Sequence, residues 1–246
     1  MKILILAAGY GTRLHPLTKH WPKPLLLVKE KPIIAHIIER AQKIRQADEI
    51  IIVTNDRHYN FFKNWQKYYK ANKRLTILND KSTTEKNRLG AIGDIQFVIR
   101  KKGIKNEDLL VIGGDNLFSF NLGRFVKFAR RRKNECCIGL YNLERRHVIN
   151  RYGVVTLDKQ GKVADFREKP KSSISRLVSM CIYYLPKNSL KLVATYLRGK
   201  SCPDTPGSYI KWLCKRFPVH GHVLSGVWCD IGDLDSFYNA AVTFKE

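Results

Sequence analysis

Apolar runs without interruption alternate with helical repeats through the first half of the chain. Three runs rich in β-branched residues predict strands buried on both faces of a sheet, and a shorter run predicts a fourth: 1–8, 49–54, 108–112 and 75–78. Between them, apolar and aromatic side chains recur at helical spacing over 33–41, 56–69 and 90–101. This alternation predicts an α/β fold with a Rossmann-like, doubly wound and mostly parallel sheet.

The rhythm changes near residue 135, where short strand-like segments follow one another closely. They lie at 136–141, 153–157, 162–167 and 177–184. Asp158–Gly161 has the composition of a tight turn between two of them, and helical spacing returns at 188–197 and 208–217. No linker or repeat interrupts the chain. We therefore expect one domain, residues 1–246, in which 135–246 forms a β-rich elaboration on 1–134.

The charge of the chain is strongly positive. Lys and Arg number 45 against 21 Asp and Glu, a formal net charge of +24. Such a field attracts anions, whether nucleotides, nucleic acid or an acidic membrane face. The one dense basic run, residues 130–133, is predicted to close a helix, where cations oppose the negative end of the dipole. A solvated helix end is thus favoured over a nucleic-acid patch, and no nucleic-acid partner is expected.

The cysteines and the start of the chain bear on location. The six cysteines form no C-x-x-C pair, and no histidine stands at zinc-like spacing from them. The apolar opening run is too short for a signal peptide or a membrane span. We expect a reduced, cytoplasmic protein without integral membrane contact.

A loop rich in glycine follows the first strand, at the edge where open α/β sheets bind ligands. Gly9 and Gly11 would let backbone N–H groups approach a phosphate, and Arg13 could bond its oxygens. Taken alone, the two glycines fit a simple tight turn better. The spacing matches neither a dinucleotide-binding loop nor a P-loop. However, Lys23 follows between two prolines that would hold its ammonium group in a fixed position.

These segments, LAAGYGTRLHPLT and WPKPLLLV, resemble the opening of the sugar-1-phosphate nucleotidyltransferases. That group contains glucose-1-phosphate thymidylyltransferase and the UDP- and GDP-sugar pyrophosphorylases. The resemblance implies their fold, a dependence on Mg²⁺, and a nucleoside triphosphate and a sugar 1-phosphate as substrates. It also implies that Arg13 and Lys23 are catalytic. The triphosphate would be held by Ala7, Ala8, Gly9, Gly11 and Thr12.

Two aspartates match the metal-binding positions of that family. Asp115 follows the strand at 108–112, where an aspartate by itself is as often a turn former or a helix cap. The resemblance implies that it binds the metal and the nucleotide. Asp230 lies in a W-x-D-x-G segment and would be the second metal ligand. Asp233 and Asp235 are expected to cap and begin the last helix.

Two further segments match the sugar pocket of the family. RYGVV contains Gly153, and FREKP contains Glu168 and Lys169. The resemblance implies that Gly153 contacts the sugar, that Glu168 accepts bonds from its hydroxyls and that Lys169 meets its phosphate. The alternative is a surface β-hairpin with a charged tip. The order of the two segments along the chain favours the sugar site.

The segment 79–94 departs from the family, because the glutamine usual in thymidylyltransferases is absent. Asn79 and Asp80 are candidates for the polar edge of the base, and Gly90 for the base or ribose. Glucose 1-phosphate with dTTP or UTP is expected. A cytidylyl- or guanylyltransferase acting on phosphocholine, heptose phosphate or mannose phosphate is the alternative, as is a non-catalytic nucleotide-binding relative. A homodimer is left open.

Overall fold

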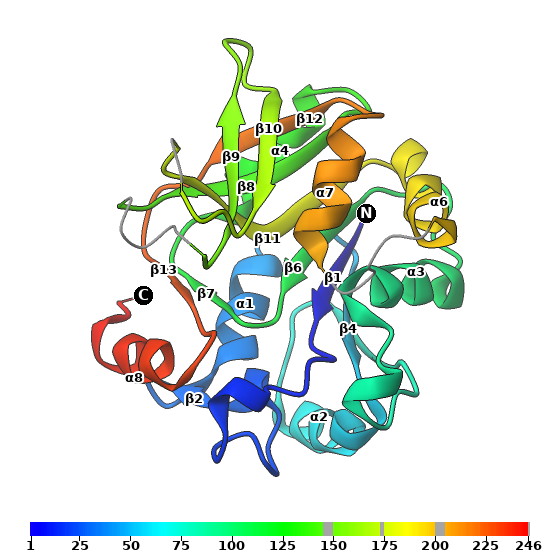
Figure 1. Ribbon diagram of the computed structural model, residues 1–246. Helices are drawn as coiled ribbons and strands as arrows, with labels where there is room; N and C mark the ends of the chain where they lie inside the picture. Colours follow the sequence, from blue (N-terminus) through cyan, green and yellow to red (C-terminus); the bar gives the residue numbers. More distant parts are fainter. Residues whose placement is uncertain (145–149, 173–174, 200–204, 246) are drawn as a thin grey trace.

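The computed structural model describes residues 1–144, 150–172, 175–199 and 205–245, built around a nine-stranded sheet (Figure 1). Four parallel strands form its first part, in the order β6 (Leu109–Gly113), β1 (Lys2–Leu6), β4 (Glu49–Thr54) and β5 (Arg74–Asn79). Every residue of β4 and β6 is buried. The predicted strands with two covered faces are therefore confirmed.

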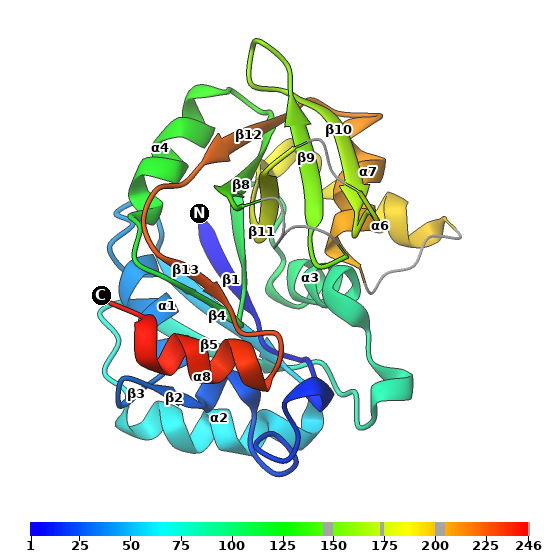
Figure 2. The same ribbon diagram turned by 60° about the vertical axis from the view of Figure 1, so that its left-hand side comes forward.

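Helices cover both faces of the sheet, as the doubly wound prediction requires (Figure 2). One face packs against α1 (Ile33–Ala41), α2 (Asp56–Tyr68), α4 (Leu122–Arg131) and α8 (Leu234–Thr243). The other packs against α3 (Gly90–Lys102), α6 (Lys191–Arg198) and α7 (Pro206–Cys214). Alternate side chains of β1 divide between the two cores: Ile3 and Ile5 join the first, Leu4 the second. Asp233 accepts the N–H of Ser236, so the predicted cap of the last helix is confirmed.

The second half of the chain adds antiparallel strands beside β6. They are β8 (Cys136–Asn142), β9 (Gly153–Leu157), β10 (Val163–Glu168) and β11 (Leu177–Leu185), and β12 (Val219–Val223) pairs with β8 in parallel. β9 and β10 form a hairpin in which the carboxylate of Asp158 accepts the N–H groups of Gln160 and Lys162. The predicted tight turn is confirmed. β12 was not predicted from the sequence.

Short elements complete the framework. Two small sheets pair β2 (Leu27–Val28) with β3 (Lys31–Pro32), and β7 (Asn116–Phe118) with β13 (Trp228–Asp230). The 3-10 turns η1 to η4 cover Thr12–Leu14, Lys23–Leu25, Glu85–Asn87 and Lys187–Ser189. Among the described residues, no helix is both long and apolar enough to cross a bilayer.

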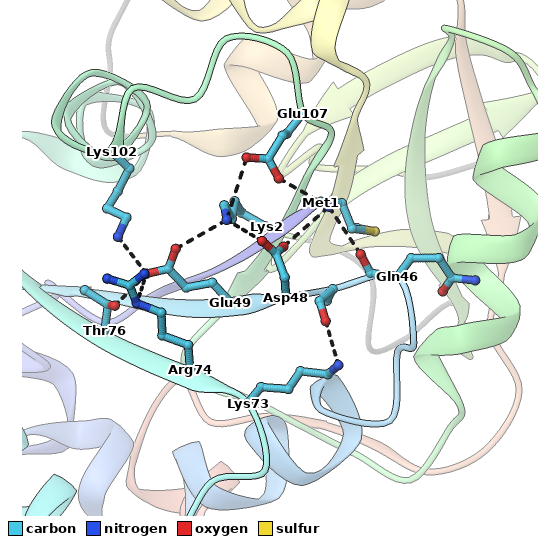
Figure 3. Close-up of polar contacts among 11 residues, drawn as sticks. Met1, Lys2, Gln46, Asp48, Glu49, Lys73, Arg74, Thr76, Lys102 and Glu107 are labelled. Atoms are coloured by element: carbon cyan, nitrogen blue, oxygen red, sulfur yellow. Dashed lines mark hydrogen bonds and ion pairs between the residues drawn. The ribbon is translucent and has the colours of Figure 1, made fainter.

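A charged network joins the amino ends of β1, β4 and β5 (Figure 3). At its centre the carboxylate of Glu49, only 2% exposed, accepts 2.6 Å bonds from Lys102 and Thr76. Lys2 and Arg74 lie 3.6 and 3.5 Å from the same carboxylate. Burial alone would raise the pKa of Glu49, but these donors and cations outweigh it and lower the pKa. The network leaves the opposite, carboxyl edge of the sheet free for ligands.

Candidate active site

The glycine loop leaves the carboxyl end of β1 and forms one wall of a cavity of about 280 Å³. Gly11 has φ +64°, a conformation that favours glycine, and its carbonyl accepts a 2.7 Å bond from the Thr18 hydroxyl. A Cβ added to Gly9 would meet no atom within 4 Å, so this residue faces open space. The cavity is also lined by Ala7, Thr12, Arg13, Lys23 and Asp115. The loop therefore offers backbone and cationic groups to one ligand space.

Lys23 reaches the same space from η2, which begins between the two prolines noted in the sequence. Its Nζ lies 2.9 Å from Oδ2 of Asp115, and its side chain is only 12% exposed. Burial would raise the pKa of Asp115, but the ammonium of Lys23 outweighs it and lowers the pKa. Two predicted residues 92 positions apart in the sequence thus form one ion pair.

Asp230 is brought to Asp115 by the pairing of β13 with β7. Asp230 stands opposite Asn116 in this pair, and the N–H of Ile231 donates to the carbonyl of Asp115 at 3.1 Å. A Cβ on Gly232 would lie 3.6 Å from Oδ2 of Asp230 and 4.0 Å from Nη1 of Arg13. The glycine loop, residue 115 and residue 230 therefore converge on one region.

The surroundings of the two aspartates shift their pKa values in opposite directions, down for Asp115 and up for Asp230. Burial first, and then the charge of Asp115, raise the pKa of Asp230 to about 6, although Lys23 and Arg13 act in the opposite direction. A divalent cation would relieve this repulsion. The described residues contain no group of three or more His, Cys, Asp or Glu side chains that could hold a metal. Two carboxylates suit Mg²⁺, because it keeps several waters and takes its remaining oxygens from substrate phosphates.

A second cavity of about 260 Å³ adjoins the first and shares Arg13 and Asp115 with it. Its wall includes Gly153, Glu168 and Lys169 from the β9–β10 hairpin, together with Asp230. A third, of about 230 Å³, is lined by Ala8, Gly90 and Asp115. All three spaces meet at Asp115. The hairpin is therefore part of the cleft and not an isolated surface feature.

Two glycines shape the wall around Glu168. A Cβ on Gly207 of α7 would lie 1.8 Å from Oε2 of Glu168, and one on Gly153 would lie 2.4 Å from Cζ of Phe166. Neither position has room for a larger residue unless a neighbour moves. Burial raises the pKa of Glu168, against the charge of Lys169.

Aromatic side chains that the sequence reading did not single out also line this cavity. The rings of Tyr152 and Trp228 lie 5.4 Å apart, and the indole of Trp228 donates to Oδ1 of Asn116 at 2.7 Å. Both residues adjoin motif positions, Tyr152 beside Gly153 and Trp228 two residues before Asp230. Adjacency to a motif is the signal that could have identified them.

Asn79 and Asp80 line none of the three spaces that contain Asp115. Asn79 donates to Asp56 at 2.6 Å, and Asp80 is buried against Ser82 and borders a separate cavity of about 590 Å³. Glu85 and Arg88 instead line the glycine-loop cavity, joined by a 2.8 Å ion pair. These two residues were not predicted from the sequence. The capping pattern that begins η3 at Thr84 is the sequence signal that could have indicated them.

Similar proteins are known from curated sequences and from solved structures. The bifunctional protein GlmU of Methanocaldococcus jannaschii is 29% identical over 234 residues, covering 94% of this chain and 51% of that protein. Mannose-1-phosphate guanylyltransferase 1 of Arabidopsis thaliana is 30% identical over 243 residues, covering 94% and 61%. The chain thus spans about half the length of the curated relatives such as GlmU.

The fold has a counterpart in a crystal structure of UDP-glucose pyrophosphorylase complexed with UDP-glucose. The TM-score is 0.80 at 21% identity, and the match covers 98% of this chain and 96% of that one. At this identity the likeness shows the fold alone. The family model of the nucleotidyl transferases matches residues 2–246, almost the whole chain. The chain therefore belongs to the nucleotidyl transferase family.

Proposed function

We propose that this protein transfers a nucleotidyl group from a nucleoside triphosphate to a sugar 1-phosphate, giving a nucleotide sugar and pyrophosphate. One observation carries the proposal. The glycine-loop cavity and the cavity of the β9–β10 hairpin adjoin and share Arg13 and Asp115. Two phosphorylated ligands can therefore meet beside the same cation and the same carboxylate.

The reaction requires positioning more than proton transfer. A phosphate oxygen of the sugar 1-phosphate, already ionised at neutral pH, attacks the α-phosphorus of the triphosphate. A new P–O bond forms, the bond to the β-phosphate oxygen breaks, and pyrophosphate leaves with the electron pair. No general base is needed. The chain has to bring two polyanions together and stabilise the charge that develops between them.

The glycine-loop side would hold the triphosphate. Backbone N–H groups of Gly9, Gly11 and Thr12, next to Ala7 and Ala8, supply donors at the open end of β1. Arg13 would hold the departing pyrophosphate, and Lys23 would act at the α-phosphate. Support comes from their shared cavity and from the ion pair that fixes Lys23.

Asp115 and Asp230 would hold Mg²⁺. When bound, the ion supplies positive charge that offsets the phosphates as they approach. The raised pKa of Asp230 supports this role, because burial and the charge of Asp115 both disfavour its ionised form.

We also propose a cytoplasmic location, supported by the five free thiols among the described cysteines; Cys202 lies outside the described residues.

The hairpin side would hold the sugar 1-phosphate. Glu168 would accept bonds from sugar hydroxyls, and Lys169 would pair with the phosphate. Gly153 and Gly207 leave room for the Glu168 carboxylate and the Phe166 ring behind it. Glucose 1-phosphate, with dTTP or UTP, is the first substrate pair to test.

A guanylyl transfer is the second candidate, and Glu85 and Arg88 favour it. A carboxylate only accepts hydrogen bonds and a guanidinium only donates them. Guanine presents the matching groups on one edge, the N1–H and N2–H donors beside the O6 acceptor. The relative from Arabidopsis thaliana bears the name mannose-1-phosphate guanylyltransferase 1. GTP with mannose 1-phosphate therefore belongs in the same test.

The test is a matrix of ATP, CTP, GTP, UTP and dTTP against glucose, mannose and heptose phosphates and phosphocholine, with pyrophosphate release as the readout. We expect one pair to dominate, activity to vanish with EDTA, and excess Mg²⁺ to restore it. A folded Asp115→Asn variant serves as the inactive control. Absence of release from every pair would identify a non-catalytic nucleotide-binding relative and refute the proposal.

A further inference from the structure

A basic groove of about 560 Å³ lies between the turn that follows α1 and the helix α4, and it shares no lining residue with the cleft. Among the described residues, six cationic side chains line it and no carboxylate does. They are Lys43, Arg45, Arg124, Lys127, Arg130 and Arg131. Figure 2 shows α4 on the outside of the molecule, across the sheet from α7.

The amphipathic pattern of α4 gathers these cations on one side. Leu122, Phe125, Val126 and Ala129 are buried in the core. Arg124 and Lys127 stand between them in the sequence, Arg130 follows Ala129, and all three are exposed. Across the groove, the exposed Lys43 and Arg45 flank the buried Ile44. Both walls are therefore anchored by apolar side chains and present cations to the same space.

The helix dipole explains only part of this arrangement. Arg130 and Arg131 lie in the last turn of α4, where cations are favourable, but Arg124 lies in the first turn, where they are not. Within the described part of the chain, none of the six forms an ion pair with a carboxylate, whereas Lys31 on a nearby segment pairs with Glu39 at 3.0 Å. Uncompensated cations in a concave site focus positive potential and concentrate anions.

The shape and chemistry of the groove favour a compact ligand. Its volume lies in the range of small-molecule sites. Four of the six cations are arginines, whose planar forks bind phosphate oxygens in pairs. In the part of the chain that the structure describes, no aromatic ring lines the groove for stacking on bases, and no exposed large apolar side chain lies in it for insertion into a lipid surface.

We propose that this groove binds a small anion with two or more phosphate groups, either inorganic pyrophosphate or the phosphate tail of a nucleotide. The site is separate from the cleft, so the proposal stands whether or not the proposed function holds. Lys43 and Arg45 would contact the anion from one wall, and Arg124, Lys127 and Arg130 from the other.

The test is a calorimetric titration with pyrophosphate, without divalent cations. The variant Lys43→Gln/Lys127→Gln removes one cation from each wall. Lys67→Gln/Lys70→Gln, at the exposed end of α2, removes the same charge elsewhere. Pyrophosphate can bind in the cleft as well as in the groove, so the Arg13→Ala variant is titrated too. The binding event that this variant loses belongs to the cleft, and the binding event that it keeps belongs to the groove. Arg124→Lys/Arg130→Lys keeps the charge and removes the forks.

We expect the groove event to weaken by about tenfold for each cation removed from the walls, and not at all in the α2 variant. The affinity of the Arg124→Lys/Arg130→Lys variant for pyrophosphate should lie between the affinities of the groove variant and the α2 variant. Parallel titrations with ATP and GTP distinguish a nucleotide, which would bind more tightly than pyrophosphate, from pyrophosphate itself. Equal weakening in the groove and α2 variants would overturn the proposal. So would groove-dependent binding of RNA or of anionic phospholipid vesicles without binding of pyrophosphate.

Discussion

The closeness of Gly207 to Glu168 allows a sharp test of the proposed sugar side of the cleft. In Gly207→Ala the new Cβ would lie 1.8 Å from Oε2 of Glu168, whereas ordinary contact begins near 3.4 Å, so the carboxylate must retreat by about 1.6 Å. A displacement of about 1 Å at a positioned group costs roughly 100-fold in rate. We expect kcat/KM for the sugar 1-phosphate to fall by about 100-fold, roughly 2.7 kcal/mol of barrier.

The assay is steady-state pyrophosphate release, with each substrate varied in turn. KM for the nucleoside triphosphate should stay unchanged, because Gly207 does not line the glycine-loop cavity. The matched variant is Gly9→Ala. Its Cβ meets no protein atom within 4 Å and would project into the triphosphate space, so it should raise KM for the nucleotide and spare the sugar phosphate. Thermal unfolding shows that both proteins are folded.

The reasoning is refuted if folded Gly207→Ala keeps the wild-type kcat/KM for the sugar phosphate. Glu168 would then have no contact with that substrate. An equal fall in kcat/KM for both substrates would also count against the reasoning, because such a fall would indicate a general distortion of α7. In the same experiment Glu168→Gln keeps the shape of the side chain and removes its charge. It should lower kcat/KM for the sugar phosphate by no more than Gly207→Ala does.

Three further changes have expected outcomes. Lys23→Ala should lower kcat by two to three orders of magnitude, about 3–4 kcal/mol, in a folded protein; near-normal turnover would exclude an electrostatic role. Glu49→Gln should lower the free energy of unfolding by about 3 kcal/mol in urea, since it removes the charge from a carboxylate that is 2% exposed and holds three cations. His58 is buried, which lowers its pKa to about 4. Because the unfolded chain takes up that proton near pH 6.5, stability should fall as the pH drops from 6.5 to 4, by about 2 kcal/mol at pH 5. His58→Gln should flatten that dependence, and an unchanged slope would show that other groups cause it.

The parallel core and the glycine loop could be predicted because their sequence signals are local. Residues of β4 are apolar over nearly their whole length, and burial on both faces needs no more information than that. The loop after β1 is defined by its own glycines. In contrast, β12 has the sequence VHGHV, in which two histidines and a glycine obscure the strand pattern. It is a strand because β8 lies beside it, which is a tertiary effect.

The residues expected to contact the base show the same limit. Asn79 and Asp80 are polar residues at a strand end, which is where sequence reasoning expects ligand contacts. In the structure Asn79 donates to Asp56, 23 residues earlier in the chain, and Asp80 accepts from Ser82, two residues later. A hydrophobic pattern records neither the distant partner nor the local one. Glu85, in η3, and Arg88, which follows it, line the glycine-loop cavity, and no hydrophobic pattern marks either of them.

The pairing of β7 with β13 has a consequence for when the cleft forms during synthesis of the chain. A ribosome releases the glycine loop and residue 115 well before residue 230, and a domain generally folds as a unit. An unfinished chain therefore carries one acidic residue of the pair and lacks the other. If the two act together as proposed, turnover starts only after β13 has left the ribosome and paired with β7, because a shorter nascent chain lacks residue 230.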